Sequence, residues 1–103
     1  MSDTGKWEIG YQDEKHKIKI EAKYRSNTLL EKRWKDFERD VTPNPYRHPR
    51  IRKLKDTSFP KGTYRYRKDP IRVVYYPEKS SKTIYPLEVA TATDVSYKRR
   101  SSR

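Results

Sequence analysis

Two short segments with strand-forming residues constrain the fold of this chain most strongly. Residues 64–67 (Tyr-Arg-Tyr-Arg) and 72–76 (Arg-Val-Val-Tyr-Tyr) are rich in the aromatic and β-branched side chains that favour strands. The residues between them include Asp69 and Pro70, which are typical of a turn. The pattern predicts two adjacent antiparallel strands, around which the other elements must be arranged.

One segment has the pattern of an amphipathic helix. Residues 28–41 place four apolar side chains on one helical face, namely Leu30, Trp34, Phe37 and Val41. Thr28 and Glu31 have the spacing of a capping box, in which both side chains satisfy backbone N–H groups at the helix start. Pro43 ends the helix because its ring cannot continue one.

Further strands are predicted on either side of this helix. Residues 7–11 and 18–24 alternate between apolar and polar side chains, and we predict two strands joined by a polar turn at 12–15. Residues 83–89 predict a last strand. Between helix and hairpin, residues 42–50 contain three prolines and predict an irregular connection.

These elements together predict an α+β fold. We expect a small, mainly antiparallel twisted sheet of about four to five strands, packed against one or two helices. Residues 1–97 are expected to form a single domain, and residues 98–103 a basic C-terminal tail.

The positive charge is concentrated in one part of the chain. There are 26 Lys and Arg against 14 Asp and Glu, a net charge of +12, and residues 43–68 alone have nine basic residues and one acid. Such a concentration indicates a surface for a polyanion, the alternative being a solvated loop. Tyrosines interleaved with arginines favour single-stranded RNA, although most of them could equally be packed strand residues. The candidate RNA-binding residues are Arg47, Arg50, Arg52, Lys53, Lys55, Lys61, Lys98 and Arg99.

Several other classes of function are not expected. The chain lacks Cys and has two His, which argues against disulfides, thiolate metal sites and Cys nucleophiles. Its three glycines are too scattered for a nucleotide-binding loop. No apolar run approaches the ~20 residues of a membrane span, and the N-terminus does not have the pattern of a secretory signal. We therefore expect a cytoplasmic protein with no cofactor and no metal.

Arginines at alternate strand positions could bind a phosphate. Arg65 and Arg67 would project to one face, and Arg72 on the adjoining strand could join them. Converging guanidiniums would form an anion clamp and could stabilise the charge that develops when an RNA 2′-hydroxyl attacks its neighbouring phosphate. The alternative is that carboxylates on neighbouring strands neutralise these arginines.

Three segments together resemble the RelE/ParE toxin superfamily. They are residues 44–55 (NPYRHPRIRKLK), 62–67 (GTYRYR) and 71–75 (IRVVY), in the order and spacing typical of that family. The resemblance covers about residues 28–97. It implies a toxin of a type II toxin–antitoxin system, and RelE-like members cut ribosome-bound mRNA without metal and leave a 2′,3′-cyclic phosphate.

The resemblance also implies roles for individual residues. Arg65 and Arg67 would hold the phosphate, and Arg72 would stabilise the transition state. Tyr97 resembles the C-terminal Tyr that stacks on or orients the scissile nucleotide, although Ser96 shifts it by one position. Residues 47–55 would face ribosomal RNA.

One departure from the family pattern keeps alternatives open. Thr91, Ala92 and Thr93 stand where the family usually has an Arg or His as a candidate general acid, so Lys98 or Arg99 would have to donate the proton. A ParE-like toxin that inhibits gyrase without cutting RNA is one alternative. A plain RNA- or ribosome-binding protein is another. For both toxin hypotheses, the mRNA endonuclease and the gyrase inhibitor, we expect an acidic antitoxin as partner. For the endonuclease we also expect the ribosome and mRNA as partners.

Overall fold

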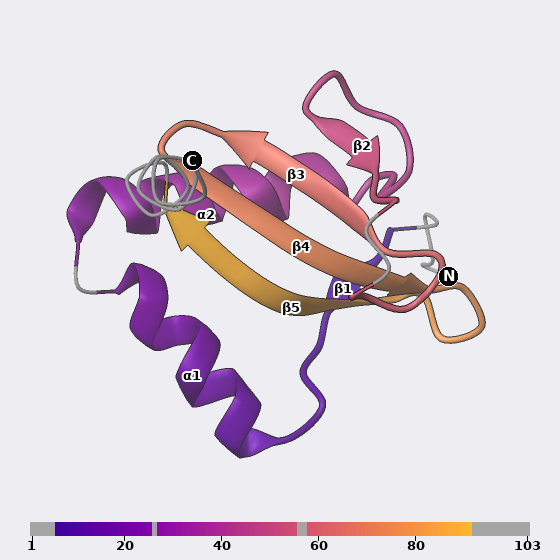
Figure 1. Ribbon diagram of the computed structural model, residues 1–103, viewed down its shortest axis with the longest axis horizontal. Coiled ribbons are helices and arrows are strands. Elements are labelled where there is room, and N and C mark those ends of the chain that lie inside the picture. The colour runs from indigo at the N-terminus through magenta and orange to yellow at the C-terminus, as the bar shows by residue number, and fades with distance from the viewer. Residues whose placement is uncertain (1–5, 26, 56–57, 92–103) are drawn as a thin grey trace.

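The computed structural model describes residues 6–25, 27–55 and 58–91. Within these residues five strands form one sheet in the order β1-β5-β4-β3-β2, and two helices accompany it (Figure 1). The elements are β1 (Glu8–Ile9), α1 (Glu14–Tyr24), α2 (Thr28–Val41), β2 (Ile51–Lys53), β3 (Tyr64–Lys68), β4 (Ile71–Glu78) and β5 (Thr83–Thr91).

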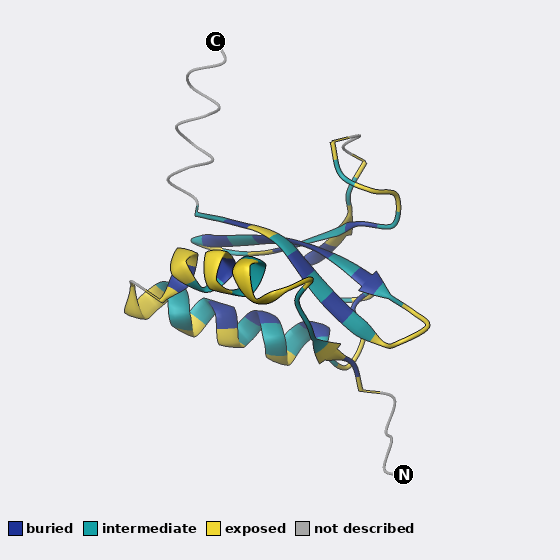
Figure 2. Cartoon of the chain, turned by 90° about the horizontal axis from the view of Figure 1, so that it is seen from below, coloured by how far each residue is buried: buried dark blue, intermediate teal, exposed yellow. Residues whose placement is uncertain are grey.

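The sheet is antiparallel except at one edge, where the short strand β1 runs parallel to β5. Both described helices lie on the same side of the sheet, so no helix of the described residues lies over its other face, which we call the helix-free face (Figures 1 and 2). The predicted α+β class with a mainly antiparallel sheet is confirmed. The predicted boundary between residues 1–97 and the tail 98–103 lies outside the described residues.

The predicted amphipathic helix is present as α2, with a different start. Asn27 is the N-cap, and its side-chain oxygen accepts hydrogen bonds from the backbone N–H groups of Leu29 and Leu30. Thr28 is already the first helical residue, so the predicted capping role for Thr28 is wrong. The helix ends at Val41, ahead of Pro43 as expected.

The segment predicted as a turn at 12–15 and a strand at 18–24 is instead the helix α1. Asp13 caps it by accepting a hydrogen bond from the backbone N–H of His16 at 2.8 Å. Of the alternating apolar residues, Ile20 and Tyr24 lie on the buried side, while Ile18 is 58% exposed. The ring of Tyr24 stacks on Trp34 of α2 with centroids 4.5 Å apart, so contact with another helix stabilises this conformation.

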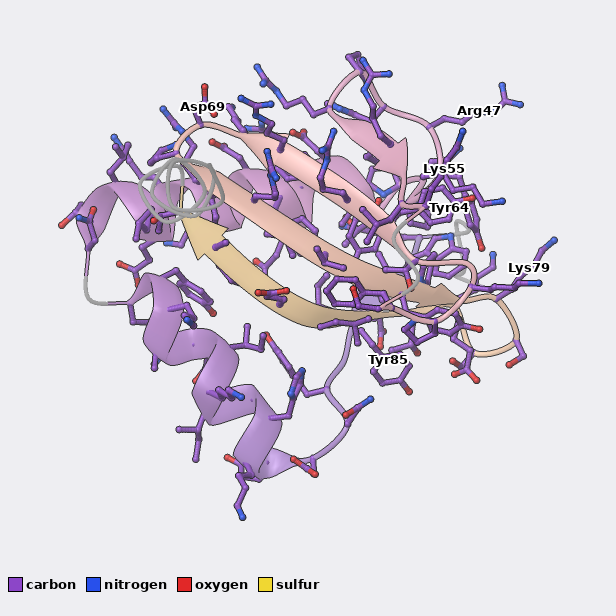
Figure 3. All side chains as sticks on the ribbon, in the orientation of Figure 1. Arg47, Lys55, Tyr64, Asp69, Lys79 and Tyr85 are labelled. Atoms are coloured by element: carbon purple, nitrogen blue, oxygen red, sulfur yellow. The ribbon has the colours of Figure 1, made fainter. Side chains whose placement is uncertain are left out.

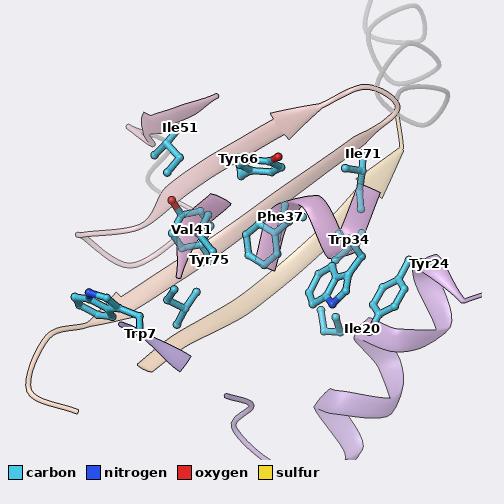
Figure 4. Packing of buried hydrophobic residues seen from close by; sticks show 13 residues of the cluster. Trp7, Ile20, Tyr24, Trp34, Phe37, Val41, Ile51, Tyr66, Ile71 and Tyr75 are labelled. Atoms are coloured by element: carbon cyan, nitrogen blue, oxygen red, sulfur yellow. The ribbon is translucent and has the colours of Figure 1, made fainter. Parts of the chain in front are cut away.

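The core lies between α2 and the inner face of the sheet (Figure 4). Phe37 is fully buried, and its ring packs edge-on against Tyr66 of β3 and Tyr75 of β4. The hydroxyl of Tyr75 donates a buried hydrogen bond of 2.6 Å to the carbonyl oxygen of Pro45, which anchors the irregular connection 42–50 beneath the sheet. These two tyrosines therefore serve the core, the structural role that the sequence analysis favoured for most of them.

Candidate nucleic-acid interface

The face of the sheet without helices carries four arginines. Side chains alternate along β3, so Tyr66 points into the core while Arg65 and Arg67 point away from it. Arg67 lies opposite Arg72 of β4, and Arg65 lies opposite Arg52 of β2. Because directly opposite residues share a face, all four side chains project from the same side of the sheet. We call this set, Arg52, Arg65, Arg67 and Arg72, the arginine face.

The arginine face is electrostatically unfavourable on its own. Partial burial lowers the pKa of the Arg65 guanidinium, and the like charges of Arg67 and Arg52 lower it further. The Nε atom of Arg65 is buried and has no hydrogen-bond partner among the described residues. A bound anion would relieve the repulsion between these charges and accept a hydrogen bond from this donor.

Nearby carboxylates do little to neutralise Arg65 and Arg67. Arg67 Nε lies 3.5 Å from the Asp69 carboxylate, but both side chains are largely exposed, and such pairs contribute little. Asp36 of α2 instead pairs with Lys68 at 3.0 Å and with Arg33 at 3.2 Å. The hydrogen bond from Lys68 lowers the pKa of Asp36. This carboxylate thus binds other cations and does not neutralise Arg65 or Arg67.

Residues 47–55, which we call the basic connection, run beside the arginine face. The backbone N–H of Arg67 donates to the carbonyl oxygen of Arg50 at 3.0 Å, and β2 pairs with β3, so this segment follows the β3 side of the sheet. Figure 3 shows Arg47 and Lys55 near β2. The predicted RNA-binding residues that the structure describes are all exposed; they are Arg47, Arg50, Arg52, Lys53, Lys55 and Lys61.

Three predicted site residues, Tyr97, Lys98 and Arg99, lie outside the described residues, and their roles stay predictions. Strand β5 ends at Thr91, and Ala90, the residue before Thr91, pairs with Arg72 of β4. The last described residues are therefore next to the arginine face in the sheet.

A pocket that the sequence analysis did not predict lies on the same face. Tyr76 of β4 and Tyr85 of β5 are opposite each other and line it, together with residues of two loops. The four-residue separation of Arg72 and Tyr76 could have indicated a shared face, because side chains alternate along a strand. The contribution of the loops has no signal in the local sequence.

Within the described residues, no three His, Cys, Asp or Glu side chains are grouped as a metal site would require. Neither described helix has the length and apolar character needed to cross a membrane.

The mainly antiparallel sheet with two helices on one face is a RelE-like fold. The comparison with solved structures supports this assignment: the chain matches one in the crystal structure of the toxin–antitoxin complex RelBE2 from Mycobacterium tuberculosis. The TM-score is 0.64 at 15% sequence identity, over 84% of this chain and 98% of that one. A scan against protein-family models and a search of curated proteins give no match. The resemblance inferred from the sequence is thus confirmed at the level of the fold.

Proposed function

We propose that this protein is the toxin of a toxin–antitoxin system and acts as a ribosome-dependent mRNA endonuclease. The observation that carries this proposal is the arginine face, which lies on the side of the sheet that neither described helix covers. An RNA strand could reach this face directly. The fold that the chain shares with a component of a toxin–antitoxin complex supports the same proposal.

The geometry suits cleavage by an internal nucleophile. The 2′-oxygen of the substrate would attack the adjacent phosphorus, and the bond from phosphorus to the 5′-oxygen would break, leaving a 2′,3′-cyclic phosphate and a 5′-hydroxyl. Arg65 and Arg67 would hold the phosphate, while Arg72 would stabilise the charge of the transition state. Tyr97 would orient the nucleotide, and Lys98 or Arg99 would protonate the leaving oxygen. This chemistry takes its nucleophile from the RNA and requires no metal or cofactor.

The proposed partners follow from the same charge. An acidic antitoxin would neutralise the basic surface, and the ribosome would present the message to it in the cytoplasm. The exposed residues of the basic connection, such as Arg47 and Lys55, would then contact ribosomal RNA.

Induced expression in a bacterial host tests this function. We expect growth arrest and new mRNA 5′ ends, mapped by primer extension, with the intact chain. Arg65→Ala and Arg72→Ala should each lower the cleavage rate about 100-fold or more, because each removes a charge aimed at the reacting phosphate. Arg25→Ala is the matched control: Arg25 is an exposed arginine at the end of α1, on the helix side. Growth arrest without new 5′ ends, unaffected by Arg72→Ala, would show that the protein is not a nuclease.

Thr91 favours a second candidate, a toxin of the same fold that inhibits gyrase. It lies at the end of β5 near the position where nucleases of the family usually have an Arg or His. A supercoiling assay separates the two functions, because an mRNA endonuclease should leave gyrase active. A plain RNA-binding protein would instead be harmless on induction.

A further inference from the structure

The pocket on the helix-free face has an aromatic floor. It has a volume of about 510 Å³ and lies between Tyr76 and Tyr85, the opposed residues of β4 and β5. Tyr11 adds a third ring, and Leu87 completes the apolar lining. Figure 3 shows Tyr85 at the opposite end of the sheet from Asp69, which marks the turn between β3 and β4.

Two glycines allow loops to pack closely against the floor. Gly62 has φ +86°, and a Cβ there would lie 3.4 Å from the ring of Tyr76. A Cβ on Gly10 would lie 2.5 Å from a methyl group of Thr83 and 3.6 Å from the ring of Tyr85. The two distances to the tyrosine rings are ordinary contact distances, and only the Cβ on Gly10 would clash, with Thr83. The two loops therefore lie against the tyrosines and form the sides of the pocket.

The polar side chains at the pocket differ from those of the arginine face. Glu78 contributes a half-buried carboxylate, held on one oxygen by a 2.7 Å hydrogen bond from Ser81 Oγ. Gln12 and Lys61 are exposed at the rim. A carboxylate repels phosphate but accepts hydrogen bonds from the N–H groups of a base. The chemistry of this end of the sheet therefore suits a base rather than the phosphate backbone.

The pocket and the arginine face lie on one continuous surface. Arg72 and Tyr76 are four positions apart on β4, about 13 Å along the strand. That distance is within the length of a short oligonucleotide. A strand whose phosphates lie on the arginines could thus place one of its bases between the tyrosines.

We propose that this pocket binds a nucleobase of the RNA held on the arginine face, with a preference for guanine. The inference rests on the proposed function, since it takes the arginine face as the phosphate site. Tyr76 and Tyr85 stack on the base. The Glu78 carboxylate accepts hydrogen bonds from the edge of the base. Guanine presents two adjacent donors at that edge, N1–H and the N2 amino group. Adenine and cytosine place an acceptor nitrogen beside their amino group, and uracil flanks its single N–H with two carbonyl oxygens, so each of them repels the carboxylate.

Fluorescence anisotropy with the full-length protein and labelled 2′-O-methyl pentanucleotides tests the proposal. The methyl group blocks the attacking oxygen, so binding is measured without cleavage. The probes are UUGUU, UUAUU and a pentamer whose central nucleotide lacks its base. We expect UUGUU to bind at least about fivefold more tightly than UUAUU, as a carboxylate contact to two donors predicts.

Variants assign the effect to the pocket. Tyr85→Ala and Tyr76→Ala should each weaken UUGUU binding about tenfold and leave binding of the abasic pentamer within about twofold, because stacking requires a base. The conservative variants Tyr85→Phe and Tyr76→Phe should keep the affinity and show that the loss is not misfolding. Glu78→Gln should abolish the preference for UUGUU over UUAUU.

The proposal would be wrong if Tyr85→Ala and Tyr76→Ala lost as much affinity for the abasic probe as for UUGUU. It would also be wrong if the intact protein bound none of the probes. These outcomes are distinct from failure of the proposed function. Growth arrest with Arg72-dependent cleavage but no base-dependent effect of Tyr85→Ala would contradict the pocket alone. Guanine-dependent binding by a harmless protein would contradict the toxin function alone.

Discussion

At the scale of single residues, Asp40 shows how a carboxylate joins α2 to β3. Its carboxylate accepts a 2.6 Å hydrogen bond from the Tyr66 hydroxyl and a 3.1 Å bond from Arg39 Nε. Partial burial alone would raise the pKa of Asp40, but these bonds outweigh it and lower the pKa below its usual range. Burial and the same bond raise the pKa of Tyr66. The hydroxyl of a core tyrosine is thereby satisfied.

This contact predicts how stability depends on pH. The folded-state pKa of Asp40 is lower than its unfolded value, so the folded protein binds fewer protons in acid. Its contribution should be fully present above about pH 4, near the unfolded pKa, and should be lost as the pH falls through the folded-state pKa. Asp40→Asn should cost about 1–3 kcal/mol at pH 7 and should flatten the acid-induced loss. Urea unfolding between pH 7 and pH 2 measures both effects. If the free energy of unfolding varied with pH in the same way for the intact protein and for Asp40→Asn, this role of Asp40 would be contradicted.

Arg65 illustrates a different use of charge. Partial burial, and after it the like charges of Arg67 and Arg52, disfavour the charged form of its guanidinium, as its lowered pKa indicates. Functional sites commonly trade stability for activity in this way. The sequence alone predicted that Arg65 and Arg67 share a face, because strand alternation depends on local geometry. It could not decide whether neighbouring carboxylates neutralise them, because that depends on which acidic side chains the fold brings beside them.

At the scale of elements, the two helix starts show how a capping residue is chosen. Both N-caps have extended backbones, with φ of −162° at Asp13 and −141° at Asn27. Each accepts from N–H groups that the first helical turn leaves unpaired. The spacing of Thr28 and Glu31 satisfies the capping-box pattern equally well, but Asn27 precedes them and occupies the cap.

A pair of variants distinguishes these two assignments. Asn27→Ala should lower the free energy of unfolding by about 1 kcal/mol, because two backbone N–H groups lose their acceptor. Thr28→Ala should change it by no more than about 0.5 kcal/mol, because Thr28 is exposed inside the first turn. Chemical denaturation of both variants measures the difference. A larger cost at Thr28 would restore the capping box suggested by the sequence.

Helix α1 shows why alternation alone can mislead. Ile18, Ile20 and Tyr24 fit a strand of period two, whereas Ile20 and Tyr24 are also one helical turn apart. Stacking on Trp34 buries Tyr24, and His16 Nε2 lies 2.7 Å from the carbonyl oxygen of Pro86 on β5. Both contacts join residues of different elements. No local pattern could therefore reveal them.

At the scale of the whole molecule, charge is divided between the two sides of the sheet. The arginine face and the exposed basic connection lie together, whereas Asp36 and Asp40 make their ion pairs at α2. The four arginines and the exposed basic connection therefore concentrate positive charge at the β2–β3 side of the helix-free face.

This division predicts the salt dependence of RNA binding. The affinity for a single-stranded oligonucleotide should fall steeply as salt rises, because bound cations displace counterions from phosphates. Arg52→Ala should reduce the slope of log K against log salt by about 0.7, the value for one phosphate contact on a single strand. Arg25→Ala should leave the slope unchanged. Anisotropy titrations from 50 to 300 mM salt, roughly the range in which such slopes are measured, provide the comparison. Equal slopes for Arg52→Ala and the intact protein would place the RNA elsewhere.

The sequence by itself determined the hairpin, the amphipathic helix α2 and the common direction of Arg65 and Arg67. All three depend on periodicities of two or 3.6 residues, which neighbouring residues encode. Tertiary structure alone decided that α1 is a helix, that both helices cover one face of the sheet, and that Tyr76 and Tyr85 meet beneath two glycine-containing loops. These features depend on contacts between residues far apart in the chain. The sequence therefore supplied the charges of the site, and packing decided which surface they occupy.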